Sequence, residues 1–557
     1  MYKFPKGSAD FKEIRMEGYV YIDKTKYIEL LENSGNKSVH FFRPRRFGKS
    51  LFTSMLECYY DYNMADNFDN LFQGTYIHEH PTTKKNQYYV LKFNFSGFGN
   101  IRGEELLTDF NMKVCDALIG FKEYYNLKVP VLENVSAVRS LSRFLVQIRS
   151  QLKGRKLYII IDEYDYFAND LLSFSFDEFT NAIRSDGFIR AFYEELKNAT
   201  EGIIEKIFIT GVSPITLNSM TSGYNISTNL SLDSDFNEML GFTTDEMKYL
   251  ISLIEGIEYP EMILNKMKQT YDGYIFSKDA EKHLYNPNMA LYYLDYYQRK
   301  GKEPDSLIDP NIYSDYNKIN NLLDIKPNKE QNNALLEIIT NGTIACQLTL
   351  SYNLQKDFSK NDFISLLFYL GYLTIQDSVY DELILKVPND VIRSVYFDYF
   401  NEMLKKKYMV YTDDYAEAVK QILSEQKNDK LITCAERTLA SLDNRDSMKF
   451  DEKVIKVILT SILIPTSHML VKNEYPVENG YIDLALFPKD NRKPIILVEL
   501  KYIKTSDFNE QLLHVKRKEA FRQLQNYRSA KEFEGKDIMQ WILIFSKDKC
   551  VLNEIID

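Results

Sequence analysis

The chain has 557 residues, 45% of them hydrophobic and 27% charged, which is typical of folded proteins and unlike disordered or collagen-like chains. At roughly 150 residues per domain, this length predicts three or four domains. The net charge of −10 excludes a globally basic protein that coats nucleic acid, so any nucleic-acid surface has to be local.

Cysteine usage and hydropathy predict the compartment. The five cysteines are an odd number and form no C-x-x-C pair, which argues against a disulfide framework and a zinc site. The first residues lack the apolar core of a signal peptide, and no apolar run approaches the ~18 residues that a membrane helix needs. We therefore expect a soluble cytoplasmic protein that has no membrane partner.

Four short, apolar and almost uncharged runs near the start of the chain are predicted to be buried strands. Strands covered on both faces have this pattern, and the helical segments between them predict a parallel sheet. The layout is α/β and suits a nucleotide-binding domain. The predicted strands are Ser38–Phe42, Tyr89–Phe95, Leu157–Asp162 and Ile204–Thr210.

The rest of the chain divides by its periodicity and turn signals. A second α/β unit near the end is predicted to contain helices over 450–464 and 508–532 and strands over 470–474, 481–487, 494–501 and 540–545. A polar stretch, Lys326–Asn333, reads as a loop. The predicted domains are 1–235 (P-loop ATPase-like), 236–330 (helical lid region), 331–400 (helices and a hairpin, winged-helix-like), 401–444 (helical connector) and 445–557 (nuclease-like).

The sequence RPRRFGKS at 43–50 follows the first predicted strand and opens a helix, the position of a phosphate-binding loop. Gly48 allows backbone N–H groups to close around phosphate oxygens, Lys49 supplies positive charge, and the Ser50 hydroxyl joins a Mg²⁺ shell. The sequence departs from the usual motif at Arg43, which stands where a first glycine is expected.

Two further strands end in polar residues that fit the same site. Asp162 would hold Mg²⁺ and Glu163 would polarise the attacking water, while Thr210 could sense the terminal phosphate. Arg45 and Arg46 could contact phosphate or a neighbouring subunit, or pair with surface carboxylates. The predicted cofactors are ATP and Mg²⁺, with Ser50 and Asp162 at the metal, Glu163 catalytic, and Arg43, Arg46, Gly48, Lys49, Ser50, Asp162 and Thr210 binding the nucleotide.

Two alternatives remain for this motif. GKS can be a helix start and Asp162-Glu163 an ordinary strand end. The domain can also bind ATP, hydrolyse it slowly and act as a switch.

A pair of carboxylates lies in apolar strands of the second α/β unit. Asp483 and Glu499 are joined by a short loop, and Glu499 shares one face of its strand with Lys501. Charged side chains in such strands are costly to bury unless they are paired or bind a metal. We predict a Mg²⁺ site at Asp483 and Glu499 that activates water against a phosphodiester, with Lys501 as a further catalytic residue.

The residues around this pair leave several readings open. Glu452 could complete the metal site or serve the helix dipole, and Glu478 reads as a solvated loop residue. Gln523 and Tyr527 lie one turn apart on one helix face. Residues 445–557 hold 19 Lys/Arg against 17 Asp/Glu, which suits a polyanion. The alternative is a salt-bridged sheet edge or a degenerate nuclease fold. The helix also carries basic residues and a histidine: His514, Lys516, Arg517, Lys518, Arg522 and Arg528.

Together these motifs resemble a bacterial family with an AAA-ATPase-like N-terminal domain and a C-terminal PD-(D/E)xK nuclease domain. The resemblance implies a P-loop parallel sheet of the additional-strand class, a helical and winged-helix middle, and a restriction-endonuclease-like α/β domain with Asp483, Glu499 and Lys501 on the motif positions. It also implies that arginine is the usual residue at position 43. The matching segments are YIDKT (21–25), RPRRFGKS (43–50), DEYD (162–165), TGVSP (210–214), GFT (241–243), YDGY (271–274), YNP (285–287) and GYL (371–373).

The sequence thus favours an enzyme in which ATP binding or hydrolysis gates Mg²⁺-dependent cleavage of nucleic acid, DNA in the first place, in defence, repair or mobile-element biology. The alternative is a nucleotide switch that binds DNA or protein and keeps a silent nuclease fold. A sequence-specific transcription factor ranks last, because the helix DFISLLFYL (362–370) is apolar. A homo-oligomer is left open.

Overall fold

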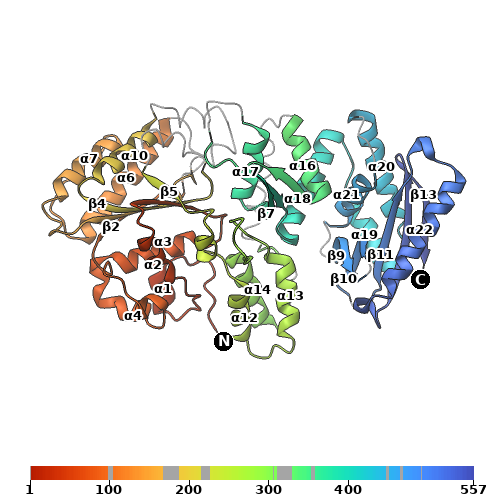
Figure 1. The fold of residues 1–557 in the computed structure, drawn as a ribbon, viewed down its shortest axis with the longest axis horizontal. Coiled ribbons are helices and arrows are strands. Elements are labelled where there is room, and N and C mark those ends of the chain that lie inside the picture. The colour runs from red at the N-terminus through yellow and green to blue at the C-terminus, as the bar shows by residue number, and fades with distance from the viewer. Residues whose placement is uncertain are drawn as a thin grey trace. The chain divides into compact units, whose positions relative to one another are not determined.

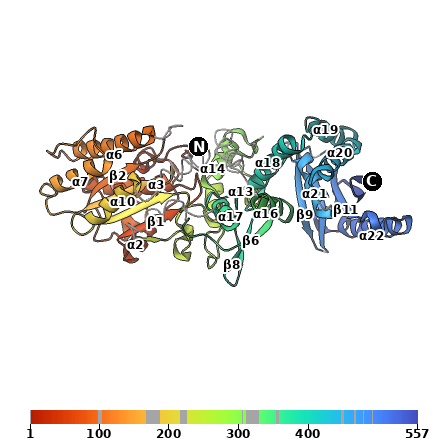
Figure 2. The ribbon, with the colours of Figure 1, turned by 90° about the horizontal axis from the view of Figure 1, so that it is seen from above.

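The computed structural model describes residues 2–97, 104–166, 187–214, 226–304, 306–309, 329–352, 358–446, 451–464, 468–478, 480–490 and 492–556. Figures 1 and 2 show its elements from two sides. The chain divides into two compact units, Met1–Ala334 with Thr343–Asp390, and Leu335–Gly342 with Val391–Asp557.

The first unit is built on a five-stranded sheet of order β2-β3-β4-β1-β5, in which every pairing is parallel. All side chains of β1 and β3 are buried, as their apolar runs predict. The four predicted strands are confirmed, and the short polar β5 was not predicted. The strands are β1 (Ser38–Phe42), β2 (Tyr89–Asn94), β3 (Leu157–Asp162), β4 (Ile204–Gly211) and β5 (Ser227–Asn229).

Helices cover both faces of this sheet (Figure 1). In α7, Ser136 caps the first turn, and the buried Leu141, Phe144, Leu145 and Ile148 follow the spacing of one helix face. Helices α6, α7 and α10 lie on one side and α1 to α4 on the other. Their bounds are α1 (Phe11–Met16), α2 (Lys26–Asn33), α3 (Lys49–Tyr60), α4 (Phe68–Phe72), α5 (Tyr76–Glu79), α6 (Glu104–Tyr124), α7 (Ala137–Ile148) and α10 (Phe188–Ala199).

The segment that follows is helical, as predicted. Thr243 and Glu246 form a reciprocal capping box at the start of α12, and a proline opens both α13 and α14. The helices are α12 (Thr244–Ser252), α13 (Pro260–Tyr271) and α14 (Pro287–Lys300).

A small antiparallel sheet of order β6-β8-β7 lies in the same unit, with the predicted hairpin formed by β7 and β8. The loop predicted at Lys326–Asn333 is wrong from Lys329 onward, where α16 begins, because EQNNALLEII places apolar residues at helical spacing; residues 326–328 lie outside the described part. The elements of the sheet and its helix are β6 (Thr343–Cys346), α17 (Lys360–Tyr369), β7 (Thr374–Val379) and β8 (Glu382–Lys386). The preceding helix is α16 (Lys329–Asn341), whose residues from Leu335 onward belong to the second unit.

The second unit contains a five-stranded mixed sheet of order β13-β12-β11-β10-β9, in which only β11 and β12 pair in parallel. Helices α20 and α21 pack on one face and α22 on the other (Figure 1). The predicted helices and strands are present, and β13 was missed. The elements are α18 (Asp390–Tyr408), α19 (Tyr415–Glu425), α20 (Asp429–Asp446), α21 (Glu452–Leu463), β9 (Met469–Val477), β10 (Gly480–Pro488), β11 (Ile495–Tyr502), α22 (Glu510–Arg528), β12 (Ile538–Ser546) and β13 (Lys549–Ile556).

All five cysteines are free thiols. Among the helices that the structure describes, none combines the length and the apolar character needed to cross a membrane.

Candidate functional sites

The loop between β1 and α3 folds around the amino group of Lys49. Gly48 and Arg46 both have left-handed backbone, with φ of 93° and 68°, which turns the loop back toward the helix. The Lys49 Nζ donates to the carbonyl oxygens of Arg43 (2.9 Å) and Pro44 (3.0 Å). Burial lowers the pKa of Lys49, and the nearby carboxylates, Glu163 first, oppose that shift.

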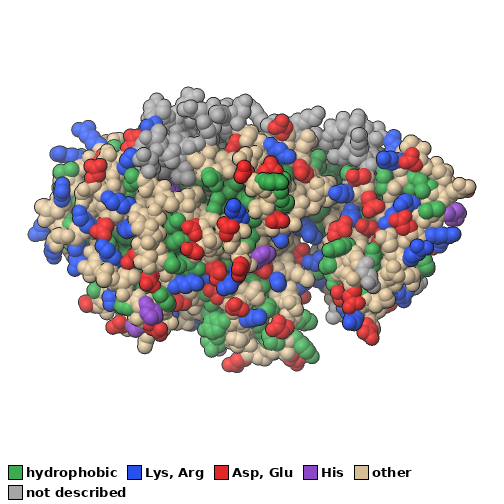
Figure 3. Space-filling view, viewed as in Figure 1, with side chains coloured by type: hydrophobic (Ala, Val, Ile, Leu, Met, Phe, Trp, Pro, Cys, Tyr) green, Lys and Arg blue, Asp and Glu red, His purple; other side chains and the backbone are tan. Residues whose placement is uncertain are grey.

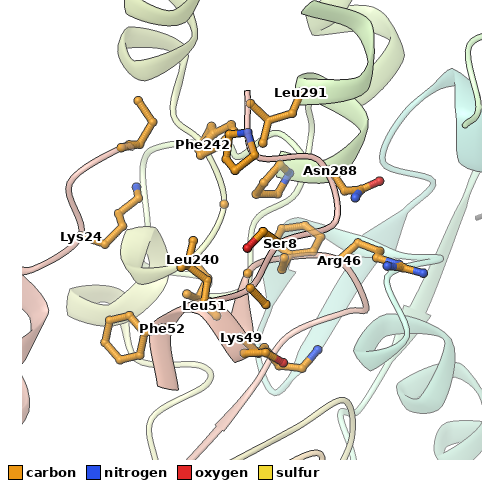
Figure 4. A pocket seen from close by; sticks show the side chains of 18 of the residues that line it. Ser8, Lys24, Arg46, Lys49, Leu51, Phe52, Leu240, Phe242, Asn288 and Leu291 are labelled. Atoms are coloured by element: carbon orange, nitrogen blue, oxygen red, sulfur yellow. The ribbon is translucent and has the colours of Figure 1, made fainter. Parts of the chain in front are cut away.

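A cavity of about 470 Å³ opens over this loop. Its walls come from six places in the chain: the N-terminal segment, the loop with the start of α3, Glu163 and Tyr166 after β3, residues 239–242, Leu250 on α12, and the start of α14. Figure 4 shows Lys49 and Arg46 with the apolar side chains of Leu240, Phe242 and Leu291. The cavity therefore joins cationic groups on the loop to an apolar wall.

Five predicted site residues line this cavity: Arg46, Gly48, Lys49, Ser50 and Glu163. Glu163 has a left-handed backbone, with φ of 55°, an uncommon conformation for a residue other than glycine. Its Oε2 is buried and has no hydrogen-bond partner among the described residues. Burial raises the pKa of Glu163, and the Lys49 ammonium opposes the shift. A carboxylate with an unsatisfied oxygen faces a basic loop.

Asp162 and Thr210 lie beneath this cavity and do not line it. Both are 1% exposed. The Thr210 hydroxyl donates to Asp162 Oδ1 (2.6 Å), and the Thr53 hydroxyl on α3 lies 3.4 Å from Oδ2. These contacts tie the ends of β3 and β4 to the helix that follows the loop.

Arg43, predicted among the nucleotide-binding residues, directs its side chain into the protein and not into the cavity. The guanidinium is 1% exposed and donates to the carbonyl oxygens of Phe42, Ser231, Phe236 and Asn237. It lies 4.2 Å from the ring centroids of Phe41 and Phe276. A glycine could not make these bonds, so arginine at this position joins the end of β1 to the segment after β5.

The DEYD and TGVSP segments are bound to each other. The Asp165 carboxylate accepts from the backbone N–H groups of Val212 (3.0 Å) and Ser213 (2.8 Å), and the Tyr164 hydroxyl donates to the Ser213 carbonyl (2.6 Å). A Cβ on Gly211 would overlap the Tyr164 ring. The second aspartate of DEYD therefore fixes the loop after β4.

The YIDKT segment has a similar linking role. The Lys24 Nζ donates to both carboxylate oxygens of Glu246, at 2.6 and 2.8 Å, and Glu246 also caps α12. Burial lowers the pKa of Lys24, although Glu246 opposes it. Since Lys24 lines the cavity, this ion pair connects the cavity wall to α12.

The second candidate site lies where β10 separates from β11. Their pairing covers Leu484–Leu486 with Ile496–Val498, and Asp483 is the next residue on β10. Asp483 Oδ2 accepts from the Leu500 N–H (2.9 Å), and the Lys501 Nζ donates to Glu499 Oε1 (2.6 Å). The structure thus brings the three predicted residues Asp483, Glu499 and Lys501 together.

Glu499 carries the strongest electrostatic perturbation of this group. It is 1% exposed, and its Oε2 has no hydrogen-bond partner among the described residues. Burial, and then the Asp483 carboxylate, raise the pKa of Glu499 to about 8. Burial lowers the pKa of Lys501, but Glu499 and Asp483 outweigh it, and the net shift is upward.

Two charged neighbours were missed in the sequence. The Lys456 Nζ on α21 donates to Asp483 Oδ1 (2.7 Å) and also contacts Glu474 Oε1 on β9. The signal was available, because Lys456 is the single charge in the apolar stretch VIKVILTSIL. Glu474 had no comparable sequence signal.

The other acidic candidates differ in position. Glu452 is half-buried, and burial followed by Asp483 raises its pKa. Glu478 lies 3.6 Å from Lys531 at the surface, in keeping with a solvated residue. No three acidic, histidine or cysteine side chains are grouped as a metal site within the residues that the structure describes. Asp483 and Glu499, with one buried unsatisfied oxygen, still form a hard oxygen donor pair that fits Mg²⁺.

Gln523 and Tyr527 on α22 belong to the same neighbourhood. Burial, and then the Glu499 carboxylate, raise the pKa of Tyr527, and the Gln523 side chain opposes that shift. The Gln523 Oε1 is buried and lacks a partner among the described residues.

The basic residues of α22 are partly neutralised. Arg517 pairs with Glu554 at 2.6 Å and Lys516 with Glu519 at 2.8 Å, whereas His514, Lys518 and Arg522 are exposed. On the face of each unit drawn in Figure 3, acidic and basic side chains are interspersed. The face of each unit drawn in Figure 3 therefore shows no uniformly positive surface among the described residues.

Two family models match the chain. Residues 5–221 match the family described as predicted AAA-ATPase, and residues 450–555 match the PD-(D/E)XK nuclease superfamily. The chain therefore contains an AAA-ATPase-like domain and, toward its C-terminal end, a domain of the PD-(D/E)XK nuclease superfamily, which confirms the resemblance read from the motifs.

The chain is also similar to an uncharacterized protein in the vnfD 5'region of Azotobacter chroococcum mcd 1. The two are 28% identical over 289 residues, which cover 51% of this chain and 50% of the relative. The chain thus matches about half the length of this curated relative.

Proposed function

We propose that the chain is a metal-dependent nuclease whose activity is gated by ATP binding or hydrolysis. The observation that carries the proposal is Glu499, whose buried Oε2 has no partner among the described residues although Asp483 and Lys501 adjoin it. An unsatisfied buried carboxylate oxygen is costly and indicates a missing ligand.

In the nucleotide half, Lys49 binds the β- and γ-phosphates from the loop, and Ser50 with Asp162 holds Mg²⁺. Glu163 orients and polarises water, a role supported by its unsatisfied oxygen at the cavity wall. Thr210 acts through its hydrogen bond to Asp162. The strand β4 between β1 and β3 supports an assignment to the additional-strand class of P-loop proteins. The order α16, β6, α17, β7, β8 supports a winged helix.

In the nuclease half, Asp483 and Glu499 hold Mg²⁺, and Glu452 completes the donor set. A bound divalent cation in such a site polarises the phosphodiester and activates water. Lys501 then positions the attacking water or stabilises the negative charge that develops on phosphate. The exposed Lys518 and Arg522 contact the nucleic-acid backbone, which we take to be DNA.

The experiment is cleavage of circular and linear DNA with Mg²⁺ or Mn²⁺, with and without ATP. Asp483→Ala should abolish cutting because it removes a metal ligand, and Lys49→Ala should abolish the dependence on ATP. Cutting that persists in Asp483→Ala would refute the site. If no DNA is cut, the same series on RNA separates a different substrate from an inactive domain.

A second candidate is a nucleotide switch that binds DNA or protein and keeps a silent nuclease fold. It is favoured by Asp483, both of whose oxygens already accept hydrogen bonds, from Lys456 and from the Leu500 N–H. This candidate predicts ATP binding without cleavage of DNA or RNA, and no difference in divalent-cation binding between the wild type and Asp483→Ala.

A further inference from the structure

Lys456 is a buried charge in α21, and it is the single charged residue after the first two positions of that helix. It is 8% exposed on α21, where every residue from Ile455 to Leu463 is buried. A buried ammonium is costly unless carboxylates surround it. Here the Asp483 and Glu474 carboxylates do so, and they outweigh burial and raise the pKa of Lys456.

Glu474 lies opposite Asp483 in the register of β9 and β10, at a point where their pairing is locally interrupted. The β9–β10 pairing includes Ile482 with Tyr475 and Leu484 with Asn473, and it omits the register pair Asp483 and Glu474 between them. Glu474 has left-handed backbone, with φ of 48°, inside a strand. Backbone of this kind persists where the surroundings enforce it, and here the Glu474 carboxylate meets the Lys456 ammonium.

The two oxygens of Asp483 have different partners. Oδ2 accepts from a backbone N–H, that of Leu500, whose position is fixed by β11. Oδ1 is held by the flexible Lys456 side chain. A divalent cation that binds Oδ1 therefore has to displace the Lys456 ammonium, and Glu474 is its other carboxylate contact.

We propose that the Lys456 ammonium occupies the metal-binding oxygen of Asp483 while no metal is bound. When a divalent cation binds Asp483, the ammonium is displaced and remains paired with the Glu474 carboxylate. Both are positioning residues, and the inference rests on the proposed metal-dependent function. Lys456 keeps the buried Asp483 carboxylate neutralised while the site is empty. Glu474 lowers the cost of opening the site because Lys456 keeps one carboxylate partner throughout.

The proposal predicts opposite effects of two substitutions and a coupling between them. Lys456→Gln removes the competing cation and tightens Mn²⁺ binding. Glu474→Gln removes the carboxylate that stays paired with Lys456, so the ammonium is harder to displace from Asp483 and Mn²⁺ binds about tenfold more weakly. A tenfold change is typical of the coupling energy between charged residues in contact. In the Lys456→Gln background, Glu474→Gln has almost no effect, because no ammonium remains to be moved.

The test is calorimetric titration of the full chain with Mn²⁺ in the absence of nucleotide. The series comprises wild type, the two single variants, the double variant and Asp483→Ala. Lys453→Gln, on the exposed side of α21, is the charge-matched control. Lys456→Met, which keeps the buried stem, is a second variant if Lys456→Gln fails to fold, as judged by thermal unfolding. The Glu474 side chain is 60% exposed, so Glu474→Gln should not impair folding.

An equal loss of affinity from Glu474→Gln in both backgrounds would overturn the proposal, since it would make Glu474 a ligand or a distant charge. Unchanged affinity in Glu474→Gln, or a Lys456→Gln effect no larger than that of Lys453→Gln, would also overturn it. If the wild type and Asp483→Ala bind Mn²⁺ alike, the proposed metal site itself fails.

Discussion

Gly371 lies against Pro44 with no room for a side chain: a Cβ on the glycine would be 2.8 Å from both Cβ and Cγ of the proline. Pro44 belongs to the loop that surrounds Lys49, and its carbonyl accepts from the Lys49 ammonium. Gly371 follows α17 in the small β6–β8 domain. The loop and this domain are therefore in direct contact within the first unit.

Gly371→Ala should destabilise the first unit by about 1–3 kcal/mol and weaken ATP binding, because it adds both backbone strain and a clash with Pro44. Thermal unfolding and ATP titration measure the two effects. Gly301→Ala is the matched control, since Gly301 also has positive φ but open space around its Cβ position. It should cost about 1 kcal/mol and leave ATP affinity unchanged. Equal ATP affinity in both variants would mean that the contact between Gly371 and Pro44 does not affect nucleotide binding.

Lys49→Ala should remove detectable ATP binding, because it deletes the cationic group at the centre of the loop. Displacement of a fluorescent nucleotide measures this, with the exposed Lys12→Ala as control. Unchanged ATP affinity in Lys49→Ala would refute the assignment of the cavity.

Glu163→Gln should retain ATP binding and lose hydrolysis by about 10²-fold or more, the usual contribution of a general base. Phosphate release at saturating ATP is the measurement, and the exposed Glu105→Gln is the control. A variant with wild-type turnover would mean that Glu163 acts structurally.

Arg43→Lys should lower stability by about 2 kcal/mol or more, because an ammonium cannot replace a planar guanidinium that serves four carbonyls between two rings. ATP affinity of the folded variant should be unchanged. Arg46→Lys should lower ATP affinity and leave stability unchanged, since Arg46 is exposed and lines the cavity. Thermal unfolding and ATP titration distinguish the two patterns, and a stable Arg43→Lys would contradict this role.

Without divalent cations, stability should fall as pH rises from about 4.5 to about 8, because Glu499 with its pKa raised to about 8 keeps its proton longer in the folded chain than in the unfolded chain. Above that range its contribution is constant. Glu499→Gln should remove this part of the pH dependence. Chemical unfolding in a chelator at pH 5 and pH 9 measures the difference, and parallel profiles would contradict it.

Local patterns predicted much of the fold. Runs such as LYIIID at Leu157–Asp162 identify buried strands because a short apolar run with almost no charge is stable only when both faces are covered. The same reasoning missed β5 and β6, which are three and four residues long and have too little apolar surface to mark them. It missed β13 because KCVLNEII alternates weakly at an edge.

The sites divide in the same way. GKS at 48–50 could be proposed as a site because it is a local motif between a strand and a helix. Asp483 and Glu499 could be proposed because they are charges in apolar strands. The role of Arg43 was not readable, since its carbonyl partners at Ser231, Phe236 and Asn237 lie almost 200 residues away and depend on tertiary structure. Glu474 was hidden for a similar reason, because its importance depends on a backbone twist and on a lysine from another element.

The strand order has a consequence for synthesis. In the structure β1 pairs with β4 and β5, both of which come after Gly202 in the chain. At a synthesis rate of roughly 5–20 residues per second, about 10–30 s pass between the synthesis of β1 and that of its partner strand β4. During that time SVHFF is an apolar strand with unpaired edges, and nascent chains that stall before β4 should require a chaperone to stay out of aggregates.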